Sequence, residues 1–76
     1  MKNDKYLIKL GNRIRELRKG KGLSQEQLAL NAEVDRSYIG GIERGERNVS
    51  FLTLVKIAIC LECDIAEFTK GIPNDQ

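Results

Sequence analysis

Apolar residues along this chain recur at intervals of three and four, in short runs that are separated by residues typical of helix ends. The first run consists of Leu7, Leu10, Ile14 and Leu17. At this spacing the side chains lie along one face of a helix covering roughly residues 5–20, whereas a half-buried strand needs strict alternation of apolar and polar residues. The pattern therefore predicts a helical chain.

Two capping boxes mark the start of further helices. Ser24 with Gln27 three residues later predicts a helix that reaches about residue 31. Asp64 with Glu67 repeats the pattern and predicts a last short helix. In each box a side-chain oxygen can accept a backbone N–H that has no partner inside the helix.

Single capping residues delimit the two remaining helices. Asp35 is placed to cap a helix that ends at Gly45. Ser50 is placed to cap a helix that runs from Phe51 to about Leu61. Five short helices with short connections predict a compact all-α domain.

The length of 76 residues predicts a single domain over residues 1–76, with a core of about 5–70 and frayed ends at 1–4 and 72–76. A chain of this size buries only about 60% of its unfolded surface, which leaves little protein to enclose a deep substrate cavity. We therefore expect no cofactor and no small-molecule ligand.

The residue types exclude several classes of function. The chain has no histidine, so the commonest general acid/base and the commonest metal ligand are absent. Its two cysteines are too few for the disulfide framework of a small secreted domain. The sequence contains neither a signal-peptide pattern nor an apolar run of about 20 residues. These features favour a cytoplasmic protein with no membrane partner.

The net charge of +2 hides an uneven distribution along the chain. Residues 1–22 carry eight Lys and Arg against two acidic residues, which makes this segment +6, and residues 23–76 carry −4. A basic segment indicates either a solvated helix face or an electrostatic footprint for nucleic acid. Charge alone does not decide between the two.

The central stretch from Leu23 to Gly45 combines two short helices with a tight turn between them. Ala29 is a small residue at the point where the helices must cross closely. The apolar wedge between the helices is supplied by Val34, Ile39 and Ile42. This arrangement is typical of a helix-turn-helix.

Over roughly residues 7–69 the sequence resembles the lambda-repressor-like, XRE-type helix-turn-helix family. The matching motifs are Arg13-Ile14-Arg15, Gly22-Leu23-Ser24-Gln25, Leu28-Ala29, Tyr38-Ile39, Ile42-Glu43-Arg44-Gly45, Arg47-Asn48 and Leu54-x-x-Ile57-Ala58. Within the family, residues 35–39 and 43–48 are most similar to the controller proteins of restriction-modification systems. The resemblance implies a compact five-helix, lambda-repressor-like DNA-binding domain.

The resemblance also implies a recognition helix from about Arg36 to Arg44 that lies in the major groove of DNA. Arg36 is the main candidate for base reading, because a guanidinium can bond to guanine O6 and N7 together. Tyr38 either faces DNA or fills the edge of the core, and the other base-facing positions are Ser37 and Gly41. Family members often carry a base-reading side chain at the last of these positions, so we expect a sparser code here, with close backbone approach or DNA shape in its place.

Five further positions match residues that hold the DNA backbone in this family: Ser24, Gln25, Arg44, Arg47 and Asn48. The first two begin the helix that precedes the recognition helix, where outward amides and the helix dipole favour phosphate. The other three follow the recognition helix. Ordinary loop polarity is the alternative interpretation of those three.

Arg18 and Glu43 match positions that form an ion pair between the first helix and the recognition helix of the family. We expect this pair to orient the scaffold rather than contact DNA, with a net stability contribution near zero. The sequence departs from the family at Glu62, where many members have a glycine that ends the helix. Gly40 and Gly41 are unfavourable inside a helix, because each glycine lowers helix stability by about 1 kcal/mol relative to alanine.

The helix of residues 51–61 carries two apolar faces. The first is expected to pack on the domain and consists of Phe51, Leu54, Ile57, Ala58 and Leu61. The second consists of Leu52, Val55 and Ile59, turned by roughly 130° from the first. A domain this small has too little protein to cover both, so we expect a homodimer interface at the second face. Ile65 and Phe68 join either this interface or the core.

Cys60 and Cys63 form a C-x-x-C pattern at the end of a helix. A redox pair needs a helix N-terminus to stabilise its thiolate, and a zinc site needs four ligands. Packing is therefore the favoured role, and a metal shared across a dimer is the alternative. We expect no metal site within one chain.

Together these features predict a non-catalytic transcription regulator that binds double-stranded DNA as a homodimer on a pseudo-palindromic operator. RNA polymerase is a further candidate partner. The alternative is a helical protein-interaction module, an antitoxin-like partner that uses Leu52, Val55 and Ile59. A small enzyme is the remotest interpretation, because no nucleophile, base and cavity come together in the sequence.

Overall fold

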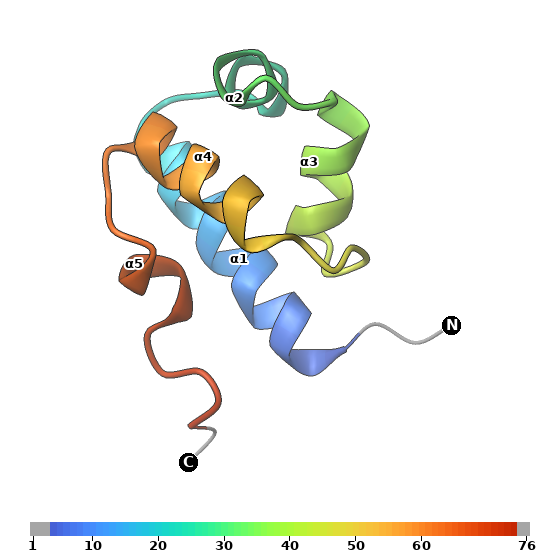
Figure 1. Cartoon of the computed structure of the whole chain (residues 1–76), viewed down its shortest axis with the longest axis vertical. Helices are drawn as coiled ribbons and strands as arrows, with labels where there is room; N and C mark the ends of the chain where they lie inside the picture. Colours follow the sequence, from blue (N-terminus) through green and yellow to red (C-terminus); the bar gives the residue numbers. More distant parts are fainter. Residues whose placement is uncertain (1–3, 75–76) are drawn as a thin grey trace.

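Helices make up all the regular structure over residues 4–74, which are the residues that the computed structural model describes (Figure 1). They are α1 (Lys5–Gly20), α2 (Gln25–Ala32), α3 (Arg36–Glu43), α4 (Phe51–Leu61) and α5 (Ala66–Thr69). α1 packs against both α3 and α5, which lie on its right and left in Figure 1, and α2 packs against α3 and α4. The predicted all-α, five-helix architecture is confirmed.

Two of the predicted caps are present and set where α2 and α4 begin. Ser24 Oγ accepts a hydrogen bond from the Gln27 N–H at 3.0 Å, and the Ser24 N–H donates to Gln27 Oε1 at 2.8 Å. Ser50 Oγ accepts from the Thr53 N–H at 3.1 Å. Both helices therefore start where a local sequence signal satisfies unpaired backbone N–H groups.

Two other predicted side-chain caps are wrong. Asp35 precedes α3, but its carboxylate accepts from the Ser37 hydroxyl and caps no backbone N–H. Asp64 does not cap α5 either, because the Glu67 N–H donates to the backbone carbonyl of Asp64 at 3.0 Å. At Asp35 the carboxylate is engaged by a hydroxyl, and at Asp64 the backbone carbonyl accepts the N–H that the carboxylate was expected to accept.

The ends of α2 and α4 are left-handed residues that are not glycine. Glu33 has a φ of 59° and Glu62 a φ of 56°. Such a conformation costs a residue other than glycine about 1–2 kcal/mol. At Glu62 the chain stops the helix even without the glycine common in the family, and Lys21 Nζ contacts Glu62 Oε1 at 2.7 Å. This ion pair lowers the pKa of the exposed Glu62 carboxyl through a hydrogen bond and charge.

The core gathers apolar side chains from all five helices. Its most deeply buried members are Ile14, Leu28, Ile39, Ile57 and Phe68, each 0% exposed. Leu10, Ala29, Ile42, Leu54, Ala58 and Leu61 complete the cluster. Over residues 4–74 the helices are too short or too polar to cross a bilayer.

The placement of Phe68 corrects its assignment to the dimer interface and confirms the core, which was the other place open to it. Its side chain is fully buried, because α5 folds back against α1. Arg13 holds α5 there, with Nη1 donating to the Glu67 carbonyl at 2.8 Å and Nη2 to the Lys70 carbonyl at 3.3 Å. Ile65 is half-buried against the same core. Phe68 therefore does not extend the exposed apolar face of α4, and a place for Ile65 in a dimer interface stays a prediction.

Two residues that were expected to lie in frayed ends, Asp4 and Ile72, contact other parts of the chain. Asp4 caps α1, with its carboxylate accepting from the Tyr6 N–H at 2.7 Å. Ile72 is half-buried and packs against the core. Residues 1–3 and 75–76, which were also expected to be frayed, lie outside the described residues.

A glycine allows α1 and α3 to approach each other closely. A β-carbon at Gly11 would lie 2.7 Å from the Glu43 carbonyl oxygen and closer still to that of Ile42. These are backbone atoms, which a rotamer change cannot move. Any side chain at Gly11 must therefore push α3 away from α1.

We predict that Gly11→Ala lowers the free energy of unfolding by about 1–3 kcal/mol or more, because the added methyl overpacks the helix crossing. Chemical denaturation monitored by circular dichroism measures the change. Gly20→Ala is the control, since no atom lies within 4 Å of a β-carbon there. Equal stability of the two variants would contradict the close approach.

Candidate nucleic-acid interface

The N-terminal turn of α3 carries polar side chains into solvent. Arg36 and Ser37 are both exposed, and Ser37 donates its hydroxyl to Asp35. Tyr38 is half-buried against the core. A guanidinium beside the positive end of a helix dipole favours an anionic partner. Arg36 is therefore an exposed cation at the end of α3 where an anion is most stable.

Gly41 is buried, although the sequence analysis expected it to face DNA directly. The side chain of Arg47 covers it, so that a β-carbon at Gly41 would lie 2.7 Å from Arg47 Cγ. The same guanidinium lies 5.8 Å from the centre of the Tyr38 ring, in cation–π range. A side chain from the following loop therefore occupies the place of a side chain on the helix.

The side chain of Arg44 covers Gly40, the residue before Gly41, in a similar way. A β-carbon at Gly40 would lie 3.1 Å from Arg44 Nη1 and 3.6 Å from Gln25 Oε1. Arg44 Nε also contacts Glu46 Oε1 at 3.1 Å in an exposed ion pair. Asn48 is exposed in the same loop. Residues 44–48 thus bring two guanidinium groups to the surface beside α3.

The two residues at the start of α2 have side chains that already bind within the protein. Ser24 uses its hydroxyl as the cap of α2. Gln25 turns its amide inward and donates from Nε2 to Glu43 Oε1 at 3.0 Å. A phosphate at this end of α2 would therefore meet the backbone N–H groups of the first turn rather than the Gln25 amide nitrogen.

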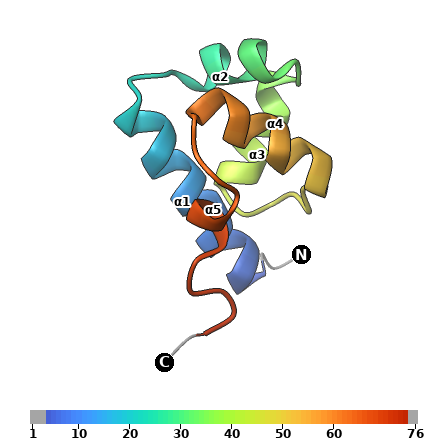
Figure 2. The same cartoon turned by 60° about the vertical axis from the view of Figure 1, so that its left-hand side comes forward.

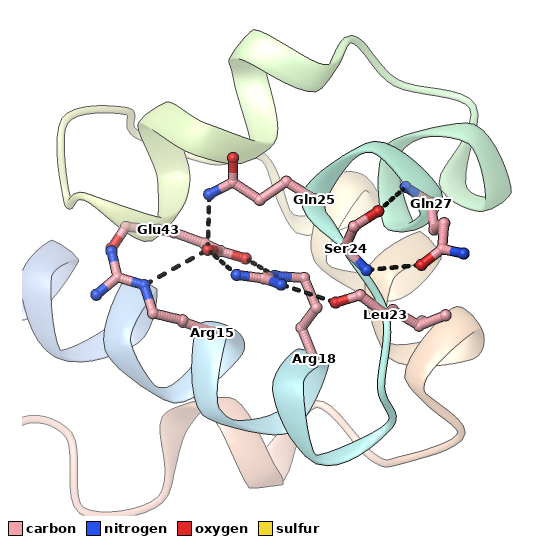
Figure 3. Close-up of polar contacts among 7 residues, drawn as sticks. All are labelled: Arg15, Arg18, Leu23, Ser24, Gln25, Gln27 and Glu43. Carbon is pink, nitrogen blue, oxygen red and sulfur yellow. Dashed lines mark hydrogen bonds and ion pairs between the residues drawn. The ribbon is translucent and has the colours of Figure 1, made fainter.

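Glu43, at the end of α3, is a buried carboxylate that joins three helices (Figure 3). Arg18 Nε donates to Glu43 Oε2 at 2.6 Å, and Arg18 Nη2 donates to Glu43 Oε1 at 2.9 Å. Arg15 Nε lies 3.5 Å from Oε1, which also accepts from Gln25. Arg18 Nη1 donates to the Leu23 carbonyl at 2.7 Å. The structure contains the ion pair that the resemblance implied and adds Arg15 and Gln25 to it.

These contacts set the charge of the carboxylate. Burial by itself raises the pKa of Glu43, but the hydrogen bonds from Arg18 and Gln25 and the charges of Arg18 and Arg15 together hold that pKa below its ordinary value. The pKa of Arg18 shifts in the opposite direction, because its hydrogen bond to Glu43 raises the guanidinium pKa against the effect of burial. Both partners are therefore charged at neutral pH.

The second apolar face of α4 is exposed and contains one residue more than the sequence analysis expected. Leu52 is 71% exposed and Ile59 is 70% exposed, with Val55 half-buried between them. Phe51, assigned to the core, is 66% exposed on the same side. Phe51 is four residues before Val55, and residues four apart lie on the same side of a helix, so the sequence could have placed Phe51 on this face. We name Phe51, Leu52, Val55 and Ile59 the α4 patch.

Cys60 and Cys63 are free, half-buried thiols that pack against the core. Burial raises the pKa of Cys60. Burial also raises the pKa of Cys63, and the nearby carboxylates of Glu67 and Asp64 act in the same direction. A raised pKa keeps a thiol protonated and weakly nucleophilic. The environment of both residues suits a packing role.

Comparison with known proteins yields one family and several relatives. The helix-turn-helix family model matches residues 14–68. The control protein C.MunI from a Mycoplasma species is 41% identical over 69 residues, which cover 90% of this chain and 93% of that protein.

Solved structures have the same fold. The crystal structure of the restriction-modification controller protein C.AhdI from Aeromonas hydrophila has 53% sequence identity and a TM-score of 0.80, covering 82% of this chain and 94% of that one. The controller protein C.Esp1396I, solved as a tetramer in complex with its natural 35 base-pair operator, has 36% identity and a TM-score of 0.79, covering 91% of each chain.

We predict that Glu43→Gln lowers the free energy of unfolding at neutral pH by about 3 kcal/mol, because Arg18 is left as a buried charge without its carboxylate. Because the folded-state pKa of Glu43 is lowered, the wild type should lose stability as the pH falls below about 4.5, through the folded-state value, and the variant should lose less. Urea unfolding at several pH values measures both effects. A double variant, Arg18→Met with Glu43→Leu, should be more stable than Glu43→Gln, because it leaves no unpaired buried charge. A Glu43→Gln variant as stable as the wild type would show that the Glu43 carboxylate does not hold α1, α2 and α3 together.

Proposed function

The chain belongs to the helix-turn-helix family, and from this membership we propose that it is a sequence-specific transcriptional regulator that binds double-stranded DNA. It acts as a homodimer on a pseudo-palindromic operator, as the controller of a restriction-modification system, and residues 1–76 form its single domain. The observation that carries the proposal is the exposed Arg36 at the N-terminus of a helix that Glu43 fixes to α1 and α2.

In this proposal α3 enters the major groove, which is wide enough for one α-helix. Arg36 reads a guanine through two hydrogen bonds from its guanidinium, and Ser37 contacts an adjacent base edge. Tyr38 packs the exposed edge of its ring on a sugar or a thymine methyl. Gly41 itself contributes no contact, because Arg47 covers it.

Phosphate contacts supply most of the affinity. The N-terminus of α2, at Ser24 and Gln25, binds one phosphate through its backbone N–H groups and its dipole. Arg44, Arg47 and Asn48 hold the DNA next to α3. Arg47 is also close enough to the outer face of α3, beside Tyr38, to reach into the groove.

The α4 patch forms the dimer interface. Three of its side chains are about two-thirds exposed or more, and such a concentration of apolar surface marks an interaction site. A homodimer through the patch fits two half-sites one DNA turn apart when its two α3 helices lie about 34 Å apart. A homodimer then matches a pseudo-palindrome. The relative C.Esp1396I was solved as a tetramer in complex with its natural 35 base-pair operator, which supports self-association on DNA.

Several further properties follow from this proposal. Binding and releasing an operator requires no catalytic step, so the protein is not an enzyme and uses no cofactor. An operator of a bacterial restriction-modification system lies in the cytoplasm, so the protein acts there. A regulator that activates transcription would also contact RNA polymerase.

Selection of bound sites from random double-stranded DNA tests the proposal. Recovery of an inverted repeat with half-sites about one DNA turn apart supports both sequence-specific binding and dimerisation. Failure to enrich any sequence rejects the proposal. A stable complex with another protein that forms without DNA would instead favour the antitoxin-like alternative, in which the α4 patch binds that protein.

We predict that Arg36→Ala weakens binding to the selected site by about 1–3 kcal/mol and relaxes the preference at one base pair in each half-site. Fluorescence anisotropy with matched and mismatched duplexes measures both. Lys70→Ala removes the same charge from an exposed position at the end of α5 and serves as the control. Unchanged preference in Arg36→Ala would refute direct reading by this residue.

We predict that Leu52→Asp converts the dimer to a monomer, because a carboxylate in an apolar interface loses its hydration without a partner. Leu30→Asp is the matched control, since Leu30 is 72% exposed on α2 and lies outside the α4 patch. Analytical ultracentrifugation measures the mass of each variant. A dimeric Leu52→Asp together with a monomeric Leu30→Asp would move the interface to α2.

A further inference from the structure

Two adjacent glycines in the middle of α3 are buried, although neither has a side chain to bury. Around Gly41 the three nearest atoms to a β-carbon position all belong to Arg47, at 2.7, 3.3 and 3.5 Å. Around Gly40 the nearest atom is Arg44 Nη1 at 3.1 Å. Each glycine is therefore covered by the side chain of an arginine that follows it in the chain.

Backbone conformation does not explain these glycines. Both lie inside a regular helix, and neither is among the glycines with a positive φ, which are Gly22, Gly45 and Gly71. Alanine forms helices better than glycine does, so a helix of this kind is weakened by the pair. What the two positions provide is space directly against the helix backbone.

We propose that Gly40 and Gly41 are positioning residues, which provide seats on α3 for the side chains of Arg44 and Arg47 and so aim both guanidinium groups at DNA. This inference rests on the proposed DNA-binding function. The two glycines are then more than positions that lack a base-reading side chain. They are the reason why the side chains of Arg44 and Arg47 can lie on the surface of α3.

Second contacts hold each arginine in its seat. The Arg47 guanidinium also lies over the Tyr38 ring at 5.8 Å, and Arg44 Nε also contacts Glu46 Oε1 at 3.1 Å. A long arginine side chain loses considerable rotamer freedom when it binds. Holding it in place beforehand reduces that loss and improves affinity.

The two seats differ in tightness, which ranks the expected effects. A methyl at Gly41 would lie 2.7 Å from Arg47 Cγ, near the start of that side chain, so the Arg47 side chain must shift. A methyl at Gly40 meets the far end of Arg44, which can move by a few tenths of an ångström. Gly41→Ala should therefore affect DNA binding more than Gly40→Ala.

The test compares Gly41→Ala with Gly20→Ala, a control in α1 where a β-carbon meets no atom within 4 Å. We expect both variants to keep or raise the thermal midpoint of the wild type. Gly41→Ala should bind the selected operator roughly three- to tenfold more weakly, and Gly20→Ala should bind as the wild type does. Loss of folding in Gly41→Ala, or unchanged affinity, overturns the proposal.

A double-mutant cycle separates positioning from any direct role of the glycine. In an Arg47→Ala background, Gly41→Ala should cause no further loss of affinity, because no side chain is left to seat. An equal loss in both backgrounds would mean that DNA contacts the Gly41 backbone itself, and would overturn the proposal.

A measurement without DNA distinguishes failure of this inference from failure of the proposed function. The NMR signals of the Tyr38 ring protons should shift in Gly41→Ala and stay in place in Gly20→Ala, because only the former displaces Arg47. Unshifted Tyr38 signals in Gly41→Ala would overturn the proposal that Gly41 positions Arg47. If the signals shift but the wild type selects no DNA site, the proposed function fails, and the assignment of the arginines to DNA fails with it.

Discussion

The buried carboxylate of Glu43 is the contact on which the geometry of the whole domain depends. It lies at the end of α3 and receives hydrogen bonds from Arg18 on α1 and Gln25 on α2, with Arg15 close by. An unpaired carboxylate in this place would be costly, so α3 can occupy its position only when the other two helices are in theirs. The network therefore adds orientation more than stability, because a buried ion pair contributes little net free energy.

Shape acts together with this charge pair. Gly11 lets α1 approach the carbonyl groups at the end of α3, and the same segment of α3 carries Glu43. The crossing and the ion pair thus constrain neighbouring atoms from two sides. A helix held so firmly can present Arg36 at its other end with little freedom to reorient, which is what a reader of base edges requires.

Helix placement could be predicted from the sequence because its causes are local. The caps at Ser24 and Ser50 need only residues within one turn, and both were found. The cap expected at Asp35 failed because a neighbouring hydroxyl occupied its carboxylate. Phe51 was expected in the core and is exposed, and Phe68, for which the interface and the core were both open, is buried. Helical periodicity defines the faces of a helix but not which face a distant helix covers. α5 settles that question by folding back onto α1.

The sequence by itself determined the helices, the helix-turn-helix motif and the second apolar stripe of α4, because periodicity and capping are properties of neighbouring residues. The pairing of Arg18 with Glu43 was implied by the resemblance to a known family. Only the tertiary structure decided that Gln25 turns inward and that Arg44 and Arg47 lie over two glycines. Those outcomes depend on the space left where separate segments meet. Sequence spacing does not report such space, because it is set by the packing of the whole domain.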